Sequence, residues 1–215
     1  MHDQGDRENS QGSVAAVVDG NVGAIVELKS ETDFSAKADD FTSLVQDLAE
    51  LVAVKGEGAV ADKAKDLEDL KLTAKENIEL GQVVRFEAPA GHVIDSYLHV
   101  QGGRGVNAVL VELDGGTAEL AHDVAVHVGF TKPKYLTRDE VPADVVAAER
   151  STLEALTRNE GKPEAAIPKI VDGRIGGFFR ENCLVEQAYV KDEKQSIQQL
   201  VAPAKVVRYA QVTIG

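Results

Sequence analysis

Residues 23–54 read GAIVELKSETDFSAKADDFTSLVQDLAELVAV. An apolar run ends at Leu28, and after the polar residues that follow, apolar side chains recur at positions 34, 38, 41, 45, 48 and 52. Steps of four and three place these side chains on one face of a helix. Ser30 and Asp33 have the spacing of a capping box, and acidic residues in a first turn favour the helix dipole. The stretch predicts a strand, a polar exit and a long amphipathic helix that begins beside Phe34.

Phe34 has two interpretations. Its helical spacing with Phe41 is typical of core packing, because aromatic residues on an apolar stripe are usually buried. Its position favours another role, since it is the first member of the stripe and stands next to Asp33. There a side chain can project past the end of the helix instead of into the core.

The composition indicates an ordinary globular protein that can bury a sizeable core. The chain has 215 residues, of which 43% are hydrophobic and 27% are charged. No apolar run approaches the roughly 18 residues that a membrane span requires. The N-terminus lacks a basic region followed by an apolar one, so we expect neither a membrane span nor a secretory leader. The net charge of −13 argues against binding to nucleic acid, which needs clustered Lys and Arg.

The single cysteine, Cys183, cannot form an intramolecular disulfide. This fits a reducing compartment, and we expect a cytoplasmic protein. No Cys-His signature surrounds Cys183, so the sequence predicts a small, partly buried residue at this position and not a reactive one.

Repeated patterns divide the chain. Asp19-Gly20-Asn21 joins two apolar runs and predicts a hairpin. Val-Glu-Leu ends an apolar run at 26–28 and again at 111–113, which indicates a weak internal repeat over residues 24–100 and 107–214. Strands followed by helices and hairpins predict an α+β protein with two related subdomains, each an antiparallel β-sheet covered by helices. The expected division is a polar tail at 1–12, an N-terminal subdomain at 13–114 and a C-terminal subdomain at 115–215.

Further elements are expected along both halves. Strands are expected at 83–87, 92–101, 106–113, 184–190 and 205–214, and helices at 120–130, 142–158, 163–181 and 196–201, with 59–81 largely helical.

Signatures of enzymes are not found. His122 and His127 are five apart, which turns them roughly 140° from each other on a helix, whereas paired zinc ligands are four apart. The glycines at 102–105 lie between two expected strands, so they predict a hairpin turn and not a phosphate loop. We therefore expect no metal, no bound nucleotide or other cofactor, and no enzymatic activity.

Residues 27–37, ELKSETDFSAK, resemble the signature of the elongation factor Ts family, the guanine-nucleotide exchange factors of elongation factor Tu. The sequence departs from the usual pattern at Lys29, Ser35 and Ala38. The resemblance extends along the chain in the family's order: Gly102–Val106, Ala125–Val128, Lys132-Pro133, Gly161–Pro163, Asp172–Arg174 with Phe178-Phe179, and Leu184–Asp192.

The resemblance implies a function. Thr32, Asp33 and Phe34 would disturb the Mg²⁺ and phosphate site of elongation factor Tu and promote GDP release. Lys37 and His127 are further expected contacts, the latter on a helix that approaches the third domain of the partner. From its place on the helix alone, His127 is equally typical of a histidine at the edge of a core. The family usually begins with a small helical domain, which residues 1–12 are too short to form.

The alternative is an acidic interaction module with a different partner, or a family member without exchange activity. GDP release from elongation factor Tu discriminates between the two hypotheses.

Overall fold

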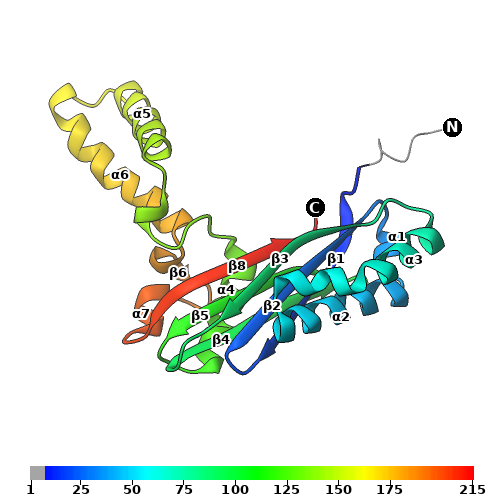
Figure 1. Cartoon of the computed structure of the whole chain (residues 1–215). Helices are drawn as coiled ribbons and strands as arrows, with labels where there is room; N and C mark the ends of the chain where they lie inside the picture. Colours follow the sequence, from blue (N-terminus) through cyan, green and yellow to red (C-terminus); the bar gives the residue numbers. More distant parts are fainter. Residues whose placement is uncertain (1–7) are drawn as a thin grey trace. The chain divides into compact units, whose positions relative to one another are not determined.

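The computed structural model describes residues 8–215, which form two compact units (Figure 1). The first unit runs to Phe130 and includes the C-terminal segment Pro203–Gly215, and the second is Thr131–Ala202. Most of the polar tail expected at 1–12 lies outside the described residues, and the first strand begins within it, at Gln11.

The first unit begins with a three-stranded antiparallel sheet. Its strands are β1 (Gln11–Asp19), β2 (Val22–Ser30) and β3 (Glu79–Glu87), in the order β1-β2-β3. Asp19 pairs with Val22 across a two-residue turn in which Gly20 has a φ of 60°, a conformation that glycine adopts without strain. The expected hairpin is confirmed.

Helical segments fill the connection from β2 to β3. They are α1 (Asp33–Ala36), α2 (Asp39–Lys55), a 3-10 helix (Glu57–Lys63) and α3 (Ala64–Ala74). Helix α2 packs on β1 and β2 (Figure 1). Its apolar face is buried, because it covers one face of the sheet: Phe41, Leu44, Val45, Leu48, Ala49, Val52 and Ala53.

The expectation of one helix from Phe34 onward is wrong. Helix α1 is a single turn, and Ala38 has an extended backbone (φ −65°, ψ 146°) from which α2 starts anew. Asp39 and Asp40 occupy the first turn of α2, where negative charge stabilises the helix dipole. The capping residue also differs from the prediction. Thr32, and not Ser30, caps α1 by accepting a hydrogen bond from Ser35.

A second antiparallel sheet has the same topology as the first. It contains β4 (His92–Gln101), β5 (Arg104–Asp114) and β8 (Lys205–Thr213), in the order β4-β5-β8. In each sheet a hairpin is joined by a strand that arrives after helices, as the weak repeat suggested. The expected boundaries of the repeat are wrong, since the turn at Gly102-Gly103 pairs β4 with β5 and so places β4 in the second sheet.

The two sheets of the first unit pack face to face, with β1 against β5. Between them lies a buried apolar cluster: Val14, Ile25, Phe86, Ala88, Ile94, Ala108, Leu110 and Val212. Helix α4 (Ala118–Thr131) packs on the second sheet, where Asn107 donates a hydrogen bond to the carbonyl of Gly129. The expected boundary at 114/115 falls at the end of β5 and does not separate the compact units, because β8 returns to pair with β5.

The second unit is built on an antiparallel pair of helices, α5 (Ala143–Asn159) and α6 (Ile167–Asn182). A small hairpin of β6 (Ala188–Tyr189) and β7 (Asp192–Ser196) and a short helix α7 (Ile197–Val201) complete it.

The prediction of a strand over residues 184–190 is wrong except at Ala188–Tyr189. Leu184–Glu186 form a 3-10 turn, because the amide of Gln187 folds back to donate to the carbonyls of Cys183 and Leu184.

The prediction of an α+β fold with antiparallel sheets covered by helices is confirmed. Over residues 8–215, no helix combines the length and the apolar character needed to cross a bilayer.

Candidate functional site

The candidate site is the turn that links β2 to α2. Ser30 and Ala36, which flank the turn, are completely buried, and the Ser30 hydroxyl donates to the carbonyl of Thr32 at 2.8 Å. Thr32 and Asp33 are exposed between these anchors. The turn is therefore fixed at both ends and presents its middle to solvent.

Phe34 projects from this turn. Its residue surface is 74% exposed, whereas Phe41, the first residue on the buried face of α2, is completely buried. The separation of α1 from α2 at Ala38 explains the difference, because Phe34 is not carried on the buried face of α2. An aromatic side chain left in water does not contribute to the core, so the Phe34 ring is available to pack against a partner.

Lys37 lies beside Phe34. Its Nζ atom is 5.8 Å from the centre of the Phe34 ring, within the range of a cation–π contact. Lys37 and Asp33 are both exposed, so an apolar ring, a carboxylate and an ammonium group share one short turn.

Glu76, which no sequence pattern singled out, contacts the same turn from the segment between α3 and β3. Its carboxylate accepts hydrogen bonds from the backbone and side chain of Thr32 and from Ser35. The contact joins residues 44 positions apart, and no local pattern points to it.

His127 does not share this site. It lies on the buried face of α4 and has no exposed surface, between the buried residues Val124, Ala125 and Val128. The exposed ring of Phe130 stacks on Tyr97, with ring centres 6.5 Å apart. The apolar spacing of 124, 125 and 128 is the signal that predicts burial of His127.

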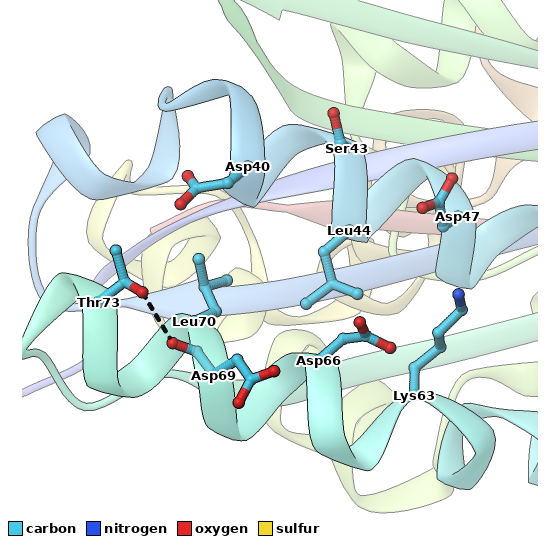
Figure 2. Close-up of a pocket in the computed structure, with 9 residues that line it drawn as sticks. All are labelled: Asp40, Ser43, Leu44, Asp47, Lys63, Asp66, Asp69, Leu70 and Thr73. Atoms are coloured by element: carbon cyan, nitrogen blue, oxygen red, sulfur yellow. Dashed lines mark hydrogen bonds between the residues drawn. The ribbon is translucent and has the colours of Figure 1, made fainter.

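An acidic groove between α2 and α3 is a separate feature (Figure 2). It encloses about 250 Å³ and is lined by Asp40, Ser43, Leu44, Asp47, Lys63, Asp66, Asp69, Leu70 and Thr73. Four aspartates against one lysine would repel a phosphate group. In the part of the chain from 8 to 215, no group of three or more His, Cys, Asp or Glu side chains is arranged to hold a metal ion.

Gly102 and Gly103 form the predicted turn between β4 and β5, and Gly105 already belongs to β5. Gly102 and Gly103 have φ values of 62° and 80°, and the Arg104 guanidinium donates to the carbonyl of Gly12 and to the side chain of Gln11. The arginine thus fastens the turn to β1 instead of facing solvent as a phosphate ligand.

Comparison with known proteins decides the family. The sequence profile of the family described as Elongation factor TS matches residues 31–215. The chain belongs to the elongation factor Ts family.

Curated elongation factor Ts proteins match nearly the whole chain. The protein of Acidothermus cellulolyticus is 43% identical over 98% of this chain and 80% of its own length. Those of Renibacterium salmoninarum and Deinococcus deserti are 39% and 38% identical, over 97% and 98% of this chain and 80% and 81% of their own lengths. The elongation factor Ts match includes the Thr32–Lys37 turn, Glu76 and α4, so all the candidate residues lie inside it.

Proposed function

We propose that the exposed turn Thr32–Asp33–Phe34 is the element with which this chain releases GDP from elongation factor Tu. As a member of the elongation factor Ts family, the chain is a guanine-nucleotide exchange factor for elongation factor Tu and acts in translation elongation. It makes and breaks no covalent bond, so it is not an enzyme. Translation takes place in the cytoplasm, and we propose the same location for this chain.

The observation that carries the proposal is the exposure of Phe34 on a turn anchored at both ends. A bound nucleotide is held by a phosphate loop and by a Mg²⁺ ion that neutralises the phosphates. An apolar side chain contributes favourably to the free energy of binding only when it leaves water. Phe34 would leave water by inserting between side chains of the partner. If those side chains support the Mg²⁺ site, the insertion weakens the hold on GDP.

Asp33 and Lys37 have supporting roles in the proposal. The Asp33 carboxylate brings a negative charge towards a site that binds a negatively charged nucleotide, and like charges repel. Lys37 keeps a cation against the Phe34 ring and offers a charge to the partner's surface. His127, being buried, can take part only by holding α4 in place, and we rank it below the turn.

Coupling between two ligands is reciprocal. Whatever this chain subtracts from the affinity of elongation factor Tu for GDP, GDP subtracts from the affinity of elongation factor Tu for this chain. The exchange factor is therefore released when a new nucleotide binds, and one molecule serves many cycles.

The test is the release of a fluorescent GDP analogue from elongation factor Tu, followed by stopped flow with excess unlabelled GDP. The release rate should rise with the concentration of the chain and approach a plateau. A rate that stays at the spontaneous value at every concentration would exclude exchange activity and leave the alternative, an acidic interaction module with a different partner or a family member without exchange activity.

A further inference from the structure

Glu76 lies in a fixed position beside the turn that carries Thr32, Asp33 and Phe34. It follows Lys75, which ends α3 in the left-handed conformation with a φ of 56°, uncommon for a residue with a side chain. Two residues later Ile78 is completely buried in the core cluster that includes Phe41. The chain is thus constrained on both sides of Glu76, and the half-buried carboxylate is directed at the turn.

The carboxylate binds the turn with both oxygen atoms. Oε1 accepts from the amides of Glu31 and Thr32, at 3.2 and 3.0 Å. Oε2 accepts from the hydroxyl of Thr32 at 2.8 Å and from the hydroxyl of Ser35. An ionised carboxylate has about four acceptor positions, and four donors from the turn address this one. Such charge-assisted bonds are stronger than bonds between neutral groups.

These donors lie on both sides of Asp33 and Phe34. The exposed pair itself makes no bond to Glu76, so the carboxylate fixes the ends of the turn and leaves its centre free to meet a partner. An exposed turn without such a clamp would sample several conformations, and ordering it on binding would cost affinity.

We infer that Glu76 is a positioning residue, which preorganises the turn so that Phe34 enters elongation factor Tu without first being ordered. The inference rests on the proposed role of the turn. It assigns to Glu76 no contact with the partner or its nucleotide, and it predicts that Glu76 acts only through Phe34.

Removal of the carboxylate should leave the fold intact. The core beneath the turn consists of Ala36, Phe41 and their neighbours, and Glu76 does not belong to it. Glu76→Ala should therefore slow exchange and leave the melting temperature close to that of the parent protein. Glu57→Ala, which removes an exposed carboxylate from the neighbouring 3-10 helix, is the matched control.

The first experiment measures GDP release with Glu76→Ala, Glu76→Gln and Glu57→Ala. Glu76→Ala should slow release about tenfold or more, as expected for the loss of charge-assisted hydrogen bonds. Glu76→Gln should recover release to within about threefold of the parent, since the amide oxygen can still accept from both backbone amides while Thr32 and Ser35 can turn their hydroxyls to accept from its NH₂ group. Glu57→Ala should be unchanged. Parent-like release by Glu76→Ala, or no recovery with glutamine, would overturn the inference.

The second experiment repeats Glu76→Ala in a Phe34→Ala background. If Glu76 acts only through Phe34, the second substitution should slow release by less than about twofold. A further tenfold loss in that background would show that Glu76 acts by another route and would overturn the inference. If the Phe34→Ala variant promotes GDP release from elongation factor Tu at the parent rate, the proposed function of the turn fails. If Phe34→Ala slows GDP release and Glu76→Ala does not, only the inference about Glu76 fails.

Discussion

Arg208 on β8 and Glu112 on β5 are 96 residues apart in the chain and form an ion pair across these two strands. The Nε atom of Arg208 lies 2.8 Å from Oε1 of Glu112. Glu112 is almost completely buried on β5, and its other oxygen lies 2.7 Å from Nδ1 of His92 on β4. The Arg208 guanidinium also lies over the ring of Phe86, 4.1 Å from its centre, and donates to the carbonyl of Glu87. One side chain thus joins the second sheet to β3 of the first.

The two partners of this pair should respond differently to substitution. Arg208→Met leaves the Glu112 carboxylate buried with His92 as its remaining partner, and we expect a loss of about 3 kcal/mol. Glu112→Gln leaves Arg208 with access to water, since 41% of its side chain is exposed, so the expected loss is about 1 kcal/mol. Urea unfolding of both variants measures the difference. A larger loss for Glu112→Gln would contradict this account.

Gly105 allows β1 and β5 to approach closely. A Cβ atom at this position would lie 2.2 Å from the carbonyl oxygen of Val14, which is backbone and cannot rotate away. Gly105→Ala should destabilise the protein by about 1–3 kcal/mol, the usual cost of overpacking. Gly58→Ala is the control, because a methyl group at that position would have no neighbouring atom within 4 Å, and it should change stability by less than about 1 kcal/mol. Equal melting temperatures for the two variants would contradict the close approach.

Cys183 should resist thiol reagents while the protein is folded. It is fully buried, and burial, together with the nearby Glu186 carboxylate, raises the pKa of its thiol above the ordinary value. The thiol pKa is higher in the folded than in the unfolded protein, so the protonated thiol favours the folded state. This contribution to the free energy of unfolding is complete at neutral pH and is lost only as the pH rises through the alkaline range. Labelling with a disulfide reagent at pH 8 should be slow without denaturant and fast in urea. Rapid stoichiometric labelling of the folded protein would show that Cys183 is accessible.

Local patterns in the sequence were sufficient to predict most helices, strands and turns of the first unit. The stripe Phe41, Val45, Leu48 and Val52 predicts α2, because burial against a flat sheet selects one helical face. The turns at Gly20 and at Gly102-Gly103 were predicted because positive φ values favour glycine.

Other features depend on contacts that no local pattern encodes. Ala38 fits the apolar stripe, yet its extended backbone separates α1 from α2 and so exposes Phe34. The assignment of β4 to the second sheet depends on strand pairing, and the clamp by Glu76 depends on a contact over 44 residues. For the candidate site, the family resemblance pointed to the turn, and the structure added Glu76, the group that binds it.

The most direct test of the central claim compares Phe34→Ala with Phe41→Ala, in stability and in GDP release from elongation factor Tu. Phe34→Ala should change the free energy of unfolding by less than about 1 kcal/mol, because the ring is exposed, and should slow release about 30-fold or more, as expected for the loss of an aromatic anchor. Phe41→Ala removes a buried ring and should destabilise the fold by about 3–5 kcal/mol. A Phe34→Ala protein that unfolds as readily as Phe41→Ala, or that is folded and still releases GDP at the parent rate, would contradict the account.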